Sequence, residues 1–171
     1  CSVRRQRQMC IRDSNICVTG DMTMSISRCT QNPSFMEEWR KGWHPENFQI
    51  KGESKSILII GSGPAGLEAT RCLSKRGYDV TLAEKDAQIG GRVSKERLLP
   101  GLSAWGRVVD YREGQINKLK NVNIYLESEI TKKDILEFDF EHICFATGSK
   151  WRNDGVGTVS YTHLTLPTNG T

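Results

Sequence analysis

The amino-acid sequence predicts an α/β fold in which helices cover a parallel sheet. Short apolar runs bounded by turn residues alternate with longer segments of helical periodicity, and a glycine-rich turn joins the first apolar run to the first helix. This alternation is typical of parallel strands joined by right-handed crossovers. Because the pattern ends near residue 151 with few strands, we expect an incomplete three-layer fold.

The first predicted strand and helix lie on either side of the glycine-rich turn. Residues 56–60, Ser-Ile-Leu-Ile-Ile, form an apolar run that is too short for a helix and is typical of a strand buried on both faces. A helix is expected from Pro64, since proline in the first turn costs no intrahelical hydrogen bond. Apolar side chains recur at helical spacing until Gly77, where we expect the helix to end.

The remaining predicted elements continue the alternation. Residues 78–83 form the second strand, and residues 103–119 carry apolar side chains at the spacing of an amphipathic helix. Two more short apolar runs, 122–126 and 142–146, supply the next strands.

Charge and hydropathy exclude some classes of partner. The formal net charge is +4, but Arg4, Arg5, Arg7 and Arg12 against Asp13 place +3 in the first 14 residues and leave +1 for the rest. A nearly neutral net charge over the rest of the chain is poor evidence for nucleic-acid binding. No apolar run approaches the roughly 20 residues of a membrane-spanning helix, and we see no secretion signal. We therefore expect a cytoplasmic protein with neither nucleic acid nor membrane as partner.

Both ends fit this fold poorly. Residues 1–14 and 158–171 have no periodicity or turn chemistry that leads into their neighbours, so we expect non-native adapter sequence there and exclude both from fold reasoning. The alternative is that they are genuine disordered termini.

The strongest functional signal is the glycine-rich turn itself, Gly61-Ser62-Gly63-Pro64-Ala65-Gly66. The first glycine permits the tight turn, the second lets the backbone approach a diphosphate, and the third lets helix and strand pack closely. The helix that follows presents unpaired N–H groups and a positive dipole end to an anion. We therefore predict a Rossmann-like site for an ADP-containing nucleotide.

Glu84 is expected to bind the ribose of that nucleotide. It ends the second predicted strand, about 20 residues after the glycine turn, where an acidic side chain accepts hydrogen bonds from ribose hydroxyls. A carboxylate there would repel a 2′-phosphate, which favours FAD, NAD or ADP over NADP. Lys85 could turn toward a phosphate, although a solvated lysine is the simpler interpretation.

Two further segments give the site a family resemblance. With the glycine turn and Glu84, the sequence Ile89-Gly90-Gly91-Arg92 resembles the opening of flavoproteins with two dinucleotide-binding domains. Ala146-Thr147-Gly148 resembles the second short motif of that superfamily, where the chain passes close to the nucleotide. The resemblance therefore adds Gly91, Arg92, Thr147 and Gly148 to the predicted nucleotide contacts.

The N-terminal part narrows the resemblance. Residues 17–33 and 38–46 resemble the segment that joins barrel and nucleotide domain in trimethylamine and dimethylamine dehydrogenases. In that family four cysteines hold a [4Fe-4S] cluster, and soft thiolate ligands suit its irons. Cys17 and Cys29 match the third and fourth, the first two have no counterpart, and Cys10 is not counted as a ligand. Without the resemblance, two cysteines alone give a weak metal signal, and both would be interpreted as structural.

The resemblance implies a division of the chain and a set of cofactors. Residues 15–49 would be a partial cluster segment with its connector, and residues 50–157 a truncated dinucleotide-binding domain holding FAD or ADP. In the family an upstream (β/α)8 barrel binds FMN and oxidises a small amine, and electrons pass through the cluster to an external acceptor. No catalytic residue is therefore assigned here. The alternatives are a fragment similar to 2,4-dienoyl-CoA reductase, which uses FAD and NADPH, and a non-catalytic adenine-nucleotide-binding module.

Overall fold

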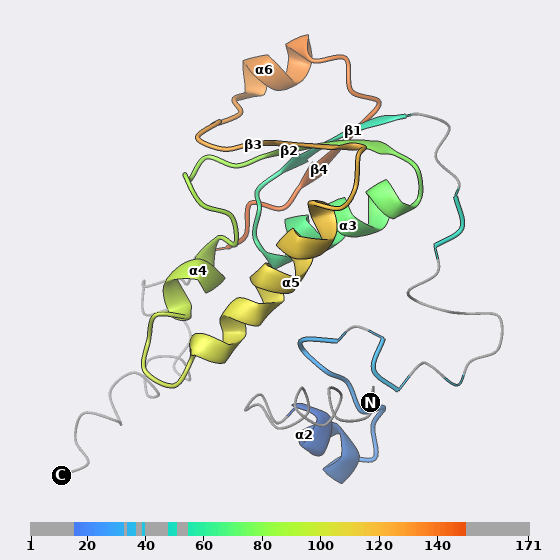
Figure 1. The fold of residues 1–171 in the computed structure, drawn as a ribbon, viewed down its shortest axis with the longest axis vertical. Coiled ribbons are helices and arrows are strands. Elements are labelled where there is room, and N and C mark those ends of the chain that lie inside the picture. Colours follow the sequence, from blue (N-terminus) through green and yellow to red (C-terminus); the bar gives the residue numbers. More distant parts are fainter. Residues whose placement is uncertain (1–15, 33, 37–38, 40–47, 51–54, 150–171) are drawn as a thin grey trace, which may run out of the picture.

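The computed structural model describes residues 16–32, 34–36, 39, 48–50 and 55–149 (Figure 1). Both segments expected to be adapter sequence, 1–14 and 158–171, lie outside these residues. The described elements, in chain order, are α2 (Ile16–Met22), β1 (Ser56–Ile60), α3 (Pro64–Lys75), β2 (Asp79–Ala83), α4 (Arg92–Glu96), the 3-10 turn η1 (Ser103–Trp105), α5 (Gly106–Ile116), β3 (Val122–Tyr125), α6 (Lys132–Glu137) and β4 (His142–Phe145).

The four strands form one parallel sheet in the order β3-β2-β1-β4. The chain first builds outward from β1 through β2 to β3 and then crosses to the other side of β1 to form β4. The strand order thus reverses between β1 and β4. In open α/β sheets, ligands bind at such a reversal, outside the carboxyl ends of the strands.

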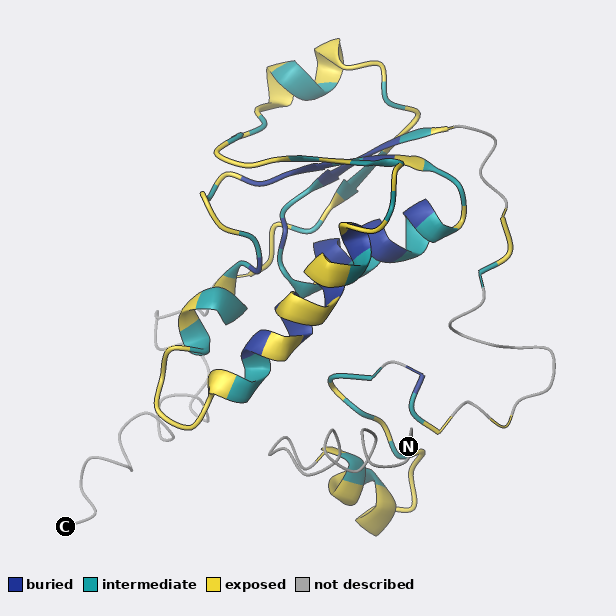
Figure 2. Ribbon diagram, in the orientation of Figure 1, coloured by how far each residue is buried: buried dark blue, intermediate teal, exposed yellow. Residues whose placement is uncertain are grey.

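The core lies between the sheet and the two longest helices. Figure 1 shows α3 and α5 on one face of the sheet, with α6 on the other side. Apolar side chains of β1 and β2 contact apolar side chains of the two helices, and the buried cluster consists of Ile57, Ile59, Leu67, Val80, Leu82, Val109 and Ile116. Burying each of these contributes about 1.5 to 3 kcal/mol. Figure 2 shows the contrast with α6, whose surface is mostly exposed.

The predicted α/β class and the order of its strands and long helices are confirmed. The observed strands match the predicted ranges to within one residue, and α3 begins at Pro64 as expected. The helix predicted over 103–119 is observed as η1 followed by α5 and a closing turn. Three short helices, α2, α4 and α6, were not predicted. Among the described residues, no helix has the length and apolar content needed to cross a membrane.

Candidate nucleotide-binding site

Gly61 brings the glycine turn against the end of β4. It has φ +103°, and a Cβ at this position would lie 2.5 Å from the carbonyl oxygen of Ala146. The Ala146 N–H donates to the carbonyl of Ile60 at 2.8 Å, which continues the β1–β4 ladder up to the turn. Two segments separated by more than 80 residues in sequence therefore meet at the strand reversal.

The other two glycines of the turn have opposite surroundings. A Cβ on Gly66 would collide with the carbonyl oxygen of Gly61, so α3 packs here with no space for a side chain. A Cβ on Gly63 would meet no described atom within 4 Å, and Gly63 has an ordinary φ of −64°. The first arrangement explains close helix–strand packing, and the second leaves open space above the start of α3.

That open space faces the N-terminus of α3. Gly63 is the N-cap, Pro64 occupies the first turn, and no side chain caps the helix. The first N–H groups of a helix have no intrahelical partner and carry the positive end of the helix dipole. Room for a ligand and donors for an anion therefore occur at the same place.

The Gly90-Gly91 segment closes one side of the turn. The Gly90 N–H donates to the carbonyl of Ser62 at 2.9 Å. Gly91 has φ +54°, and a Cβ there would lie 3.2 Å from the Cα of Gly63. The two motifs that the sequence placed near one nucleotide thus contact each other directly.

Glu84 is held at both carboxylate oxygens. Its Oε2 accepts hydrogen bonds from the Ser62 N–H at 2.7 Å and from the Ser62 hydroxyl at 2.6 Å. Its Oε1 accepts from the Asp86 N–H at 3.1 Å. Burial by itself raises the pKa of Glu84, but these hydrogen bonds outweigh it and lower the pKa below its ordinary value. An ionised, fixed carboxylate therefore stands beside the glycine turn.

The remaining predicted contacts lie at the rim of this site. Thr147 and Gly148 are exposed where the chain leaves β4, and Gly148 has φ +74°. Lys85 is exposed next to the buried Glu84. Arg92 forms an ion pair with Glu96 one turn along α4, at 2.5 Å. The structure thus brings together the glycine turn, Glu84 and Gly91, while Lys85 is exposed and Arg92 pairs with Glu96.

Comparison with known proteins places this geometry in a family. The family described as NAD(P)-binding Rossmann-like domain matches residues 59–121. Dimethylamine dehydrogenase of Hyphomicrobium sp. (strain x) is 42% identical over 144 residues, which cover 81% of this chain and 19% of that protein. The chain is homologous to one part of the dimethylamine dehydrogenase-like oxidoreductases.

Two solved structures support this relationship. Histamine dehydrogenase from Rhizobium sp. 4-9 is 68% identical with a TM-score of 0.77, over 84% of this chain and 21% of that one. The 6-hydroxypseudooxynicotine amine oxidase of Pseudomonas geniculata N1 is 53% identical with the same TM-score of 0.77, over 84% of this chain and 22% of its own. The chain thus spans about a fifth of the length of these relatives.

The two cysteines assigned to an iron–sulfur cluster are present as free thiols of intermediate burial. The Asn32 N–H donates to the sulfur of Cys29 at 3.4 Å, which is a kind of hydrogen bond that tunes cluster ligands. Among the described residues, however, no group of three or more Cys, His, Asp or Glu side chains is arranged to hold a metal.

A buried ionic cluster joins α3 to α5, and sequence reasoning missed it. Glu68 forms ion pairs with Arg71 at 2.6 Å and with Arg112 at 2.7 Å, and both arginines are almost fully buried. The Cys72 thiol also donates to Glu68 at 3.3 Å. The spacing of Glu68 and Arg71 on one helix was a visible signal, but Arg112 lies 44 residues away and is brought there only by the fold.

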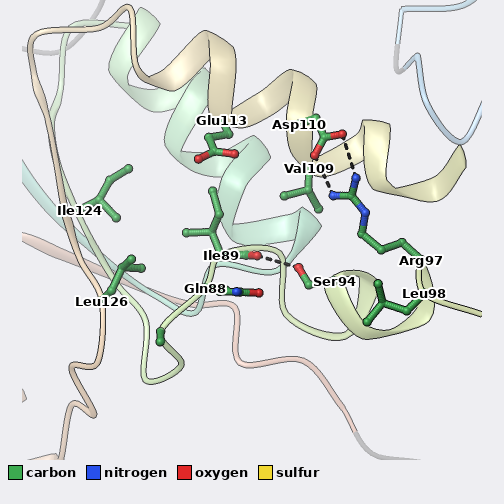
Figure 3. Close-up of a pocket in the computed structure, with 11 residues that line it drawn as sticks. Gln88, Ile89, Ser94, Arg97, Leu98, Val109, Asp110, Glu113, Ile124 and Leu126 are labelled. Atoms are coloured by element: carbon green, nitrogen blue, oxygen red, sulfur yellow. Dashed lines mark hydrogen bonds and ion pairs between the residues drawn. The ribbon is translucent and has the colours of Figure 1, made fainter. Parts of the chain in front are cut away.

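A pocket of about 760 Å³ lies between the segment after β2, the region of α4, α5 and β3 (Figure 3). An ion pair between Arg97 and Asp110 at 2.8 Å crosses one edge of it. Its lining is mainly apolar and consists of Ala87, Gln88, Ile89, Ser94, Arg97, Leu98, Val109, Asp110, Glu113, Ile124 and Leu126. None of the predicted nucleotide contacts lines this pocket, so it is separate from the glycine turn.

Proposed function

We propose that this chain binds an adenine nucleotide, FAD or ADP, at the carboxyl ends of β1 and β4. The observation that carries the proposal is the open space at Gly63 beside an uncapped helix N-terminus, together with the Glu84 carboxylate held by the adjacent Ser62. Donors for a diphosphate and an acceptor for ribose hydroxyls are therefore held by neighbouring residues of the glycine turn. Gly61, Ser62, Gly63, Pro64, Ala65 and Gly66 would supply the diphosphate cradle.

The contacts at the rim complete the proposed site. Thr147 and Gly148 would border the nucleotide where β4 ends, and Gly91 and Arg92 would border it from the start of α4. Lys85 would lie near the ribose. Bound FAD would supply redox chemistry, whereas bound ADP would supply none.

The test is direct binding by the purified 171-residue chain. Isothermal titration calorimetry with ADP, FAD, NAD and a 2′-phosphorylated ADP should show binding of at least one of the first three and weaker binding of the last. Denaturing the purified protein identifies a nucleotide that has remained bound, because flavin is yellow and ADP is colourless. A folded chain that neither carries nor binds any of these nucleotides would refute the proposal.

We further propose that the site belongs to a longer oxidoreductase that oxidises small amines and passes electrons to an external acceptor. The support is the high identity to a histamine dehydrogenase and to an amine oxidase, together with their greater length, since 84% of this chain covers only 21% and 22% of them. In that enzyme FMN would accept the hydride in a part outside this chain, residues 15–49 would belong to the cluster segment and residues 50–157 to the nucleotide domain. Cys17 and Cys29 would be two thiolate ligands of a [4Fe-4S] cluster.

The longer gene product decides this second proposal. Reduction of a dye by the enzyme with amines such as histamine or dimethylamine is the expected result. Turnover of a 2,4-dienoyl-CoA with NADPH and not of amines would instead establish the reductase alternative. A gene that encodes no barrel and no further cysteine ligands would leave the adenine-nucleotide-binding module.

A further inference from the structure

Ser62 donates two short hydrogen bonds to the proposed ribose-binding carboxylate. It lies at the variable second position of the glycine turn and is fully buried, while Glu84 is 6% exposed. Its N–H and its hydroxyl both donate to the same oxygen, Oε2, over a sequence separation of 22 residues. A buried serine in a turn otherwise built from glycines and small residues therefore contacts the acid rather than solvent.

These two bonds restrict how the carboxylate can move. With Oε2 held by Ser62 and Oε1 held by the Asp86 N–H, rotation of the carboxylate would break at least one charge-assisted hydrogen bond. A group fixed in its bound geometry before the ligand arrives costs less ordering on binding. The backbone bond from Ser62 is available to any residue at this position, whereas the hydroxyl bond requires serine or threonine.

We propose that the Ser62 hydroxyl is a positioning group for ribose recognition that acts through Glu84, whereas the contribution of Ser62 to the diphosphate cradle would come from its place in the turn. This inference rests on the proposed nucleotide-binding function. It assigns a specific task to the residue between Gly61 and Gly63, namely to hold the carboxylate so that its remaining acceptor capacity meets the ribose hydroxyls. Both Ser62 bonds fall on Oε2, while the Asp86 N–H donates to Oε1 and the Lys85 N–H also donates to the carboxylate, so a ribose hydroxyl would share or replace one of these backbone donors.

The experiment is a thermodynamic cycle in which the Ser62 hydroxyl and the ribose hydroxyls are removed separately and together. Calorimetry measures ADP and 2′,3′-dideoxy-ADP binding to the wild-type 171-residue chain and to Ser62→Ala. If Ser62 acts through the ribose contact, Ser62→Ala weakens ADP binding about tenfold but changes dideoxy-ADP binding by less than about twofold. An equal loss for both ligands would show that Ser62 only maintains the shape of the turn, and would overturn the inference.

Two further variants complete the design. Ser62→Cys keeps nearly the same shape with a poor donor, so it should follow Ser62→Ala and also serves if the alanine variant fails to fold. The matched control is Ser74→Ala, because Ser74 is a buried serine on α3 whose hydroxyl has no hydrogen-bond partner among the described residues. Ser74→Ala should bind both ligands as the wild type does. If the folded wild-type chain neither carries nor binds ADP, FAD or NAD, the proposed function itself fails. That result differs from a wild type that binds ADP while Ser62→Ala weakens both ligands equally, which overturns only the role of Ser62.

Discussion

Gly66 lies so close to the carbonyl oxygen of Gly61 that a methyl group on Gly66 would collide with it. The contact joins the first turn of α3 to the end of β1, directly below the space proposed for the diphosphate. Two glycines five residues apart therefore set the distance between helix and sheet at the site.

Substitution Gly66→Ala should consequently destabilise the fold. The obstacle is backbone rather than the end of a flexible side chain, so α3 must shift, and we expect a loss of about 1 to 3 kcal/mol in the free energy of unfolding. Urea unfolding followed by circular dichroism measures this loss. Gly114→Ala is the control, since a Cβ there meets no described atom within 4 Å and alanine is favoured over glycine within a helix. Equal stability of Gly66→Ala and Gly114→Ala would contradict the packing argument.

Gly63→Ala should separate binding from stability. Its φ of −64° suits alanine and its Cβ would enter open space, so we expect unfolding within about 0.5 kcal/mol of the wild type. The same methyl group would stand where the diphosphate is proposed to approach the backbone, and ADP binding should fall at least about tenfold. Calorimetry and urea unfolding on the same preparation check both parts. Unchanged ADP affinity in this variant would show that the diphosphate does not bind at the glycine turn.

Glu84 should decide between nucleotides with and without a 2′-phosphate. Hydrogen bonds keep its pKa below the ordinary value, so it is negatively charged at neutral pH, and a like charge placed against it costs several kcal/mol. The wild type should therefore prefer ADP to 2′-phospho-ADP by at least about tenfold, and Glu84→Gln should reduce that preference. The exposed Glu129→Gln is the control and should keep it. A preference that survives in Glu84→Gln would assign discrimination to another group.

The sequence predicted which segments meet at the candidate site better than it predicted the contacts that hold them there. The glycine turn, Glu84 and Gly91 were found because turn chemistry and strand ends are local signals that fix where a chain can approach a phosphate. The bonds from Ser62 to Glu84 were not predicted, since the register that aligns β1 with β2 is a tertiary feature. Helix α6 was missed even though Thr131 and Asp134 form a capping box with the spacing typical of a helix start.

The last prediction concerns the buried ionic cluster between α3 and α5. Burial by itself raises the pKa of Glu68, but Arg71 and Arg112 outweigh it and lower the pKa below 4.5. A lowered pKa contributes stability that is present above the ordinary pKa and is lost as pH falls through the folded value. Glu68→Gln leaves two buried guanidinium groups without their carboxylate and should cost about 3 kcal/mol at pH 7.

Urea unfolding of the wild type and Glu68→Gln across pH 7 to pH 3 measures this contribution. The difference between the two proteins should shrink below about pH 4.5, because protonation of Glu68 removes from the wild type the same charge that the variant lacks. Glu113→Gln, an exposed change on α5, should alter stability by less than about 0.5 kcal/mol at every pH. A difference between wild type and Glu68→Gln that stays constant over this range would mean that packing, not charge, makes Glu68 important, and that the two arginines are stabilised by other contacts.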